Sequence, residues 1–177
     1  MKTRDSKRLI IDADVAGASG SKTPPGPTAK HCRDFLNTVL SLSHRVVMTA
    51  KIRDEWKRHA SPFARRWRVS MDARRKVDRI IEPQENESLC TKIVNTARSE
   101  RQRENIEKDF HLLQAALATD QTVISLDGTI RRLFGRASLQ VGEIRGIIWV
   151  NPDKAEEQPI AWLQNGAPPE AHRRLSA

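Results

Sequence analysis

The chain has 177 residues, a formal net charge of +9 and an isoelectric point of about 10.1. This length is enough for one domain with a hydrophobic core, and the positive charge favours nucleic acid or another polyanion as a partner. Cys32 and Cys90 are far apart and lack metal-ligand spacing, which excludes a disulfide framework and indicates free thiols in a reducing cytoplasm.

No apolar stretch approaches membrane-spanning length. The first apolar run is interrupted at Asp12, which is too early for a signal segment. We therefore expect a cytoplasmic protein with no membrane association.

Apolar runs alternate with amphipathic segments along the chain. The apolar runs predict buried strands at residues 9–11, 46–48, 123–126 and 147–150. The amphipathic segments predict helices at residues 28–43, 50–68 with a break at Pro62, 85–118 as two helices, from 128 onward, and 160–163. Residues 74–81 fit either an edge strand or a helix, and residues 16–27 predict a mobile loop.

This alternation predicts an α/β fold: one three-layer α/β/α domain over residues 1–177, with a mainly parallel central sheet. Its core is expected to cover about residues 8–152. A short helix and a tail are expected to follow over residues 153–177.

Two of the predicted strands are followed by an aspartate, Asp12 and Asp127. The carboxyl ends of parallel strands form the edge where open α/β folds place their sites, although a single aspartate there is more often a turn former or a helix cap. Glu55 lies early in the helix after the second strand, and Asp109 is predicted to start the helix that leads into the third. Clustered carboxylates either take up protons or bind cations, and oxygen ligands suit Mg²⁺ or Mn²⁺.

The motifs around these acids resemble those of PIN-domain nucleases. The run from Arg8 to Val15 looks like the opening strand of that family. The segment from Asp109 to Thr129 is similar to its most distinctive region, where an aspartate begins an alanine-rich helix and the next strand ends in serine or threonine, a spacer and aspartate. Glu55 fits the glutamate after the second strand, and the resemblance covers about residues 8–152.

The resemblance implies a compact α/β/α fold and metal-dependent hydrolysis of RNA phosphodiester bonds. The acidic quartet of the family corresponds to Asp12, Glu55, Asp109 and Asp127. Asp12 and Asp127 are the first choices for direct metal ligands, and the other two acids would complete the cage, directly or through waters. Ser125 matches the hydroxyl residue that supports the last acid.

One position departs from the family pattern. Many members have Thr-Asn after the first aspartate, where this chain has Ala13-Asp14. Asp14 either replaces the asparagine as a polar support or simply adds negative charge to the site. The insert between Glu55 and Asp109 is also longer than in the smallest PIN toxins.

Three functional interpretations follow from the resemblance. The leading one is a ribonuclease, most commonly the toxin of a toxin–antitoxin pair, with an antitoxin-like protein as partner and a homodimer through an exposed Trp162 segment as a candidate assembly. The alternative is a catalytically silent PIN-like module that binds RNA or a protein, which Asp14 and the long insert favour. A nuclease acting on DNA ends or flaps is third, because the chain is short and lacks a helical-arch segment.

Residues 51–79 are dense in arginine and lysine. The functional interpretation is a phosphate track beside the acidic site, formed by Lys57, Arg58, Arg65, Arg66 and Arg68. The alternative is a solvated helix face with Trp56 and Trp67 in the core.

The five histidines show no ligand spacing, and we expect structural or surface positions for all of them. His111 follows Asp109 by two residues, but a helix turns it about 200° away.

Overall fold

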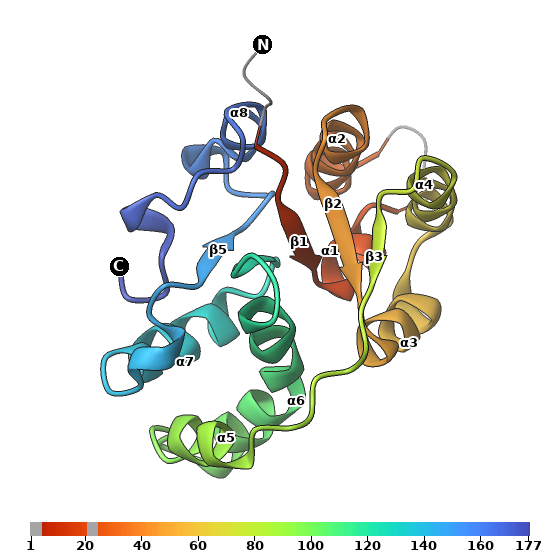
Figure 1. Cartoon of the computed structure of the whole chain (residues 1–177). Coiled ribbons are helices and arrows are strands. Elements are labelled where there is room, and N and C mark those ends of the chain that lie inside the picture. Colours follow the sequence, from red (N-terminus) through yellow and green to blue (C-terminus); the bar gives the residue numbers. More distant parts are fainter. Residues whose placement is uncertain (1–4, 21–24) are drawn as a thin grey trace.

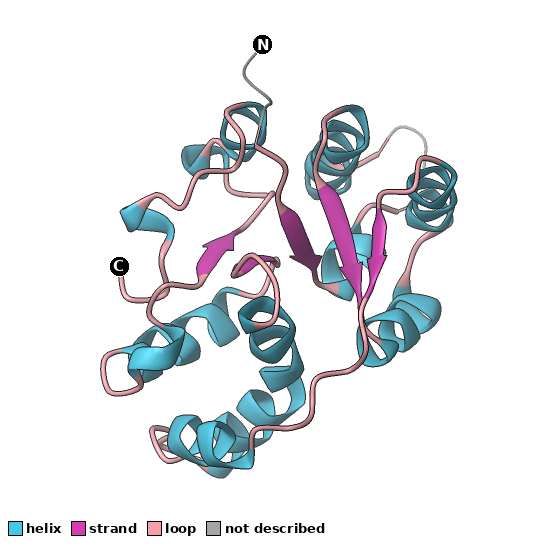
Figure 2. Ribbon diagram, viewed as in Figure 1, coloured by secondary structure: helices cyan, strands magenta, loops and turns pink. Residues whose placement is uncertain are grey.

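A five-stranded sheet runs through the centre of the computed structural model, which describes residues 5–20 and 25–177 (Figure 2). The strands lie in the order β3-β2-β1-β4-β5, and every neighbouring pair is parallel. Their bounds are β1 (Arg8–Ile11), β2 (Arg45–Met48), β3 (Val77–Arg79), β4 (Thr122–Ile124) and β5 (Ile148–Val150). Because all strands run the same way, the sheet has one carboxyl edge and one amino edge.

Helices cover both faces of the sheet, as predicted for a three-layer α/β/α domain (Figure 1). One group of helices in mutual contact consists of α1 (Ala13–Ala18), α2 (Pro27–Ser41), α3 (Ala50–His59), α4 (Pro62–Ala73) and α8 (Pro159–Gln164). The second group consists of α5 (Glu87–Val94), α6 (Glu100–Leu117) and α7 (Gly128–Ser138). Short 3-10 turns lie at Gly142–Ile144, Ala155–Glu157 and Ala171–Arg173.

The core is centred on the sheet because its strands are largely apolar. Every residue of β4 and β5 is buried, and in β1 and β2 only the first residue is partly exposed. Burial on both faces is what a parallel sheet covered by helices requires. β3 is an edge strand with no fully buried residue. Its sequence therefore lacks a clear buried-strand pattern, which is why residues 74–81 fit either a strand or a helix.

Several helices begin where the sequence supplies a side-chain cap. The capping residues, whose side chains each accept a hydrogen bond from the backbone N–H three residues further on, are Thr49, Ser61, Asn86 and Ser99. Such caps stabilise a helix by about 1 kcal/mol each. Ser61 and the following Pro62 separate α3 from α4, which confirms the predicted break.

Local predictions failed where tertiary contacts override the sequence pattern. The predicted loop began at residue 16, but residues 13–18 form helix α1. Val15 and Ala16 are buried, and α1 packs against α3. Gly17 permits this approach, because an added Cβ would lie 3.0 Å from the carbonyl oxygen of His59. Residues 21–24 of the predicted mobile loop lie outside the described residues.

Two further expectations were wrong. Helix α6 begins at Glu100, because Ser99 caps it, so Asp109 lies in the middle of an 18-residue helix and not at its start. Trp162 is only 2% exposed and its indole N–H donates to the carbonyl oxygen of Pro168 at 2.9 Å. It therefore belongs to the core and does not offer the exposed surface expected for a homodimer. No helix in the described ranges has the length and apolarity needed to cross a bilayer.

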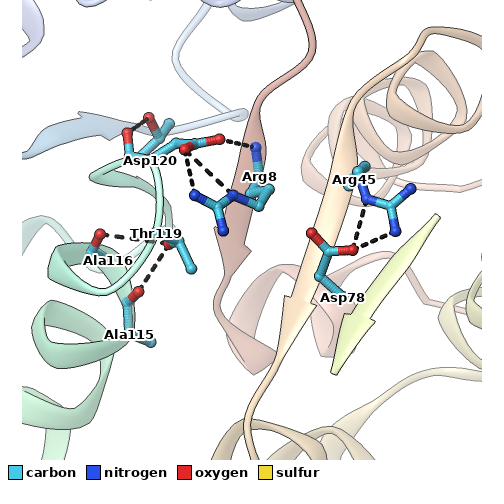
Figure 3. A network of polar contacts seen from close by, with 8 residues as sticks. Arg8, Arg45, Asp78, Ala115, Ala116, Thr119 and Asp120 are labelled. Atoms are coloured by element: carbon cyan, nitrogen blue, oxygen red, sulfur yellow. Dashed lines mark hydrogen bonds and ion pairs between the residues drawn. The ribbon is translucent and has the colours of Figure 1, made fainter. Parts of the chain in front are cut away.

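At the amino edge of the sheet, acidic and basic side chains neutralise one another (Figure 3). Asp120 accepts hydrogen bonds from the backbone N–H of Arg8 at 2.7 Å and from its guanidinium at 2.9 Å. Arg45 forms an ion pair with Asp78 on the neighbouring strand. Burial alone would raise the pKa of Asp120, but its hydrogen bonds from Arg8 outweigh burial and lower it.

We expect Asp120→Ala to lower the free energy of unfolding by about 1–3 kcal/mol, because the backbone N–H and the guanidinium of Arg8 both lose their acceptor. Urea unfolding followed by circular dichroism measures this loss. Asp34→Ala is the control: it breaks only the exposed pair with Lys30, which should cost less than about 0.5 kcal/mol. Equal losses in the two variants would contradict the assignment.

Candidate active site

The carboxyl edge brings the end of β1 beside the end of β4. Ile11 is paired with Ile124, and the backbone N–H of Asp12 donates to the carbonyl oxygen of Ile124 at 2.9 Å. This register places Asp12 next to Ser125, whose Oγ lies 3.0 Å from Asp12 Oδ2. The sheet therefore fixes the first acid and the serine relative to each other.

Ser125 connects three acidic residues. Its Oγ lies 3.0 Å from Asp12 Oδ2 and 3.1 Å from Asp14 Oδ2, and one hydroxyl hydrogen serves one of these acceptors at a time. The same Oγ accepts a hydrogen bond from the backbone N–H of Asp127 at 3.1 Å. Ser125 thus contacts the segment of the last acid, as the resemblance implies, but its hydroxyl hydrogen is directed to the first acids.

A pocket of about 360 Å³ at the carboxyl edge contains all four acids of the quartet. Asp12 comes from the end of β1, Glu55 from α3, Asp109 from α6, and Asp127 from the residue before α7. The complete lining is Asp12, Ala13, Asp14, Gly17, Glu55, His59, Lys108, Asp109 and Asp127. Segments that are up to 115 positions apart in the sequence (12 to 127) therefore meet at one rim.

The carboxylates in this pocket disfavour one another's charge. Burial raises the pKa of Asp12, and the charge of Glu55 raises it further against the hydrogen bond from Ser125. Burial raises the pKa of Asp109 to about 6, and the charges of Asp12 and Asp127 contribute to that shift. Unlike the amino edge, this edge gives its acids too little positive charge, so the pocket favours either protons or an added cation.

Asp14 is both a polar support for the fold and an additional acid in the pocket. Its Oδ2 accepts a hydrogen bond from the backbone N–H of Leu126 at 3.0 Å, which ties α1 to the end of β4. Its Oδ1 is buried and has no hydrogen-bond partner among the described residues. Burial, followed by the charge of Asp12, raises the pKa of Asp14 to about 7. Asp14 is therefore a structural support and also a further negative charge in the pocket.

Asp127 caps helix α7, so the structural interpretation of an aspartate after a strand holds for this residue. Its Oδ1 accepts hydrogen bonds from the backbone N–H groups of Thr129 and Ile130, each at 2.9 Å. The side chain is nevertheless part of the pocket lining and is exposed to solvent. Capping occupies one carboxylate oxygen and leaves the other for a ligand.

His111 is a site residue that the sequence did not reveal. It is 4% exposed, with Nε2 at 3.2 Å from Glu55 Oε2 and Nδ1 at 3.0 Å from the carbonyl oxygen of Lys108. Both ring nitrogens therefore have an oxygen within hydrogen-bond distance. Burial would raise the pKa of Glu55, but the hydrogen bond from His111 and the ring's charge outweigh burial and lower it.

Helix geometry explains why His111 was missed. Asp109 and His111 point in different directions, as expected, and they line two different pockets. Glu55 lines the acidic pocket together with Asp109, and its Oε2 lies 3.2 Å from Nε2 of His111. The pair of Glu55 on α3 and His111 on α6 forms only in the tertiary structure, and no spacing in the sequence predicts it.

The basic stretch of residues 51–79 divides into core and surface. Trp56 and Trp67 are buried and stacked with ring centroids 5.8 Å apart, and each indole N–H donates to a backbone carbonyl. They are core residues and offer no stacking surface for bases. The predicted phosphate track, Lys57, Arg58, Arg65, Arg66 and Arg68, consists of exposed side chains except for the half-buried Arg68. Lys57, Arg65 and Arg68 line a separate pocket of about 360 Å³ between α3 and α4.

The donor set fits a hard divalent cation in chemistry, because it consists of carboxylates. Two of them, Asp12 and Asp109, have raised pKa values, and the buried Oδ1 of Asp14 has no hydrogen-bond partner among the described residues. Within residues 5–20 and 25–177, however, no three His, Cys, Asp or Glu side chains are grouped so that they could hold one metal ion. The side chains thus offer ligands for an ion without forming a closed cage of three or more.

No protein-family model, no curated protein and no solved structure matches this chain.

Proposed function

We propose that this protein is a metal-dependent ribonuclease that hydrolyses RNA phosphodiester bonds at the carboxyl edge of its sheet. The observation that carries the proposal is the pocket in which Asp12, Glu55, Asp109 and Asp127 meet. The raised pKa values of Asp12 and Asp109 and the resemblance of the surrounding motifs to PIN-domain nucleases support it.

In this proposal Asp12 and Asp127 bind Mg²⁺ or Mn²⁺ directly, and Glu55 and Asp109 reach the ion through waters. Two direct carboxylates agree with the lack of a three-ligand group among the described side chains, because Mg²⁺ usually keeps several waters and is held by one or two carboxylates plus substrate phosphates. When bound, the ion would lower the pKa of a water and polarise the scissile phosphate.

The chain's own residues hold the reacting groups in place. Ser125 orients the Asp12 carboxylate by a hydrogen bond. His111 keeps Glu55 ionised and fixed, so that Glu55 accepts a hydrogen bond from the attacking water and aligns it. Lys108 at the rim of the pocket supplies a positive charge for the RNA backbone.

RNA would reach the site over the surface of α3 and α4. Lys57, Arg58, Arg65 and Arg66 are exposed there, and backbone contacts by such residues do not depend on base sequence. Cleavage preference would then come from RNA shape or from unstacked bases.

The test is cleavage of a labelled single-stranded RNA by protein that has first been stripped of metal with EDTA. We expect no products in EDTA and products after addition of excess Mn²⁺ or Mg²⁺. Cleavage that is equally fast in EDTA would overturn the metal requirement, and RNA left intact with every divalent ion would overturn the nuclease assignment.

The second candidate is a catalytically silent module that binds RNA or a protein partner. The absence of a three-ligand group among the described residues is the observation that favours it. Calorimetric titration with Mn²⁺ separates the two candidates, because a silent module has no need to hold an ion. A toxin–antitoxin setting with an antitoxin-like partner stays a prediction, which the neighbouring reading frame would test.

His111 is proposed as a positioning residue for Glu55. We expect His111→Leu to lower RNA cleavage by about 10–100-fold, because Glu55 loses its donor and compensating charge. His111→Gln keeps a donor and should recover part of the rate. Single-turnover cleavage measured across Mn²⁺ concentrations, with a thermal melt of each variant, checks this. Equal rates for wild type and His111→Leu would contradict it.

A further inference from the structure

A second pocket, larger than the candidate active site, lies along the outer face of α7. We call it the α7 pocket; its volume is about 510 Å³. It is lined by Gly128, Arg131, Arg132, Gly135 and Arg136 of α7, by Leu139 directly after the helix, by Lys154, and by residues 172 and 174–177. The helix residues recur at the three- and four-residue spacing of one helix face. The proposed reaction does not use any of them.

Packing of the last described segment against α7 forms the wall of this pocket. Gly135 allows that contact, since an added Cβ there would lie 2.9 Å from the carbonyl oxygen of Leu175. The backbone N–H of Leu175 in turn donates to the carbonyl oxygen of Ile147 at 2.9 Å, and Arg174 bridges to Ile148 at the start of β5. The pocket is therefore built by the fold and anchored to the sheet.

The lining of the α7 pocket is basic and contains no acidic side chain. Of its cations, Arg131 is paired with Glu157 at 2.5 Å. Arg132 and Arg136 donate instead to uncharged oxygens, namely Thr129 Oγ1 for Arg132 and Gln102 Oε1 for Arg136. In the described part of the chain no carboxylate lies within ion-pair distance of Arg132, Arg136, Lys154 or Arg174.

One donor at this pocket also has no acceptor. The Nε of Arg136 is buried and makes no hydrogen bond with any described residue, whereas buried N–H groups are nearly always paired. Arginines without a carboxylate partner around a concave surface, here Arg132, Arg136 and Arg174, match the planar, multidentate recognition of phosphate oxygens. The chemistry of the α7 pocket is therefore that of an anion site, with phosphate as the natural ligand.

We propose that the α7 pocket binds a backbone phosphate of the same RNA strand that is cleaved, on the side of the active site opposite the α3–α4 surface. This inference rests on the proposed function. Helix α7 begins at Gly128, the residue after Asp127, and is about 16 Å long. An RNA strand leaving the active site along α7 would enter the pocket at once, which favours RNA over an acidic peptide or a lipid headgroup.

Binding, not cleavage, tests the inference, so that its failure is separate from failure of the nuclease proposal. Fluorescence anisotropy in EDTA measures the affinity of Asp12→Asn protein for a labelled 12-nucleotide single-stranded RNA across a series of KCl concentrations. On this background we expect Arg132→Gln/Arg174→Gln to weaken binding by about 10-fold at low salt and to reduce the salt slope by about 0.7 per lost phosphate contact.

The matched control is Lys7→Gln/Arg75→Gln, which removes the same charge from residues that precede β1 and β3 at the amino edge. We expect its affinity to stay within about two-fold of the background protein. Equal losses in the two double variants would overturn the inference, because they would reflect net charge alone. Thermal melts verify folding, and Lys154→Gln replaces the test variant if that variant does not fold.

Ligand type gives a second readout. The Arg132→Gln/Arg174→Gln change is tested on binding to polyglutamate and to vesicles of anionic phosphatidylserine. If it weakens either of these as much as it weakens binding to the 12-nucleotide RNA, the α7 pocket is a general anion surface and the RNA assignment is wrong.

Discussion

Replacing Asp12 with asparagine is expected to slow RNA cleavage by roughly 10³-fold and to leave the fold intact. In the proposed site this carboxylate is a direct metal ligand, and metal ions contribute several kcal/mol of transition-state stabilisation. A loss of about 4 kcal/mol corresponds to roughly 10³ in rate. Asparagine retains an oxygen that can accept the hydrogen bond from Ser125, so the local geometry should persist.

Single-turnover cleavage of single-stranded RNA with saturating Mn²⁺ measures this effect. Asp54→Asn is the matched control, because Asp54 is an exposed acid next to Glu55 on α3 that does not line the acidic pocket. We expect the control to keep its rate within about two-fold. Equal rates for wild type and Asp12→Asn would remove the catalytic assignment of the whole quartet.

Replacing Asp14 with asparagine is expected to stabilise the metal-free protein by roughly 2–4 kcal/mol above pH 7. The pKa of Asp14 is raised to about 7 by burial and by the charge of Asp12. A pKa that is higher in the folded state than in the unfolded state costs stability once both states are ionised, at about 1.4 kcal/mol per pH unit. Because neighbouring acids titrate together, the expected gain in stability is smaller than the pKa shift multiplied by this energy per unit.

The sign of this effect gives a pH profile. Between about pH 4 and pH 7 the folded protein holds a proton on Asp14 that the unfolded chain has lost, so the stability of the wild-type protein falls as the pH rises. In the Asp14→Asn variant, stability should fall less steeply over this pH range. Asp109, whose pKa is raised to about 6, should leave a residual slope.

Urea unfolding in EDTA at pH 5 and pH 8 measures the difference between the two proteins. The gain from Asp14→Asn should be large at pH 8 and small at pH 5, whereas Asp54→Asn should alter stability by less than about 0.5 kcal/mol at either pH. Excess Mn²⁺ should narrow the gap at pH 8, because an ion that binds only the folded state offsets the repulsion between carboxylates. A pH-independent effect would contradict the electrostatic explanation.

The two edges of the sheet show why these acids invite a functional interpretation. At the amino edge Asp120 and Asp78 are each paired with an arginine (Figure 3). At the carboxyl edge Asp12, Asp14 and Asp109 have raised pKa values in one pocket, although the chain carries a net charge of +9. A basic protein could neutralise these acids with its own side chains, and the unbalanced charge therefore points to a ligand.

The sequence by itself determined the alternation of strands and helices, because apolar runs and helical spacing are local properties of the chain. It also located Asp12 directly after β1 and Asp127 shortly after β4, and parallel strands share an edge. From these facts alone the fold class and the placement of Asp12 and Asp127 at one edge could be predicted. Asp109 reaches the same pocket from the middle of α6, which the sequence pattern did not predict.

Only the tertiary structure decided the features that depend on contacts between distant segments. Helix α1 packs on α3, His111 of α6 contacts Glu55 of α3, and Gly135 admits Leu175 at the α7 pocket. Each of these contacts joins residues whose spacing carries no periodic signal. Long-range packing therefore decides which polar groups face one another and which are left without a partner.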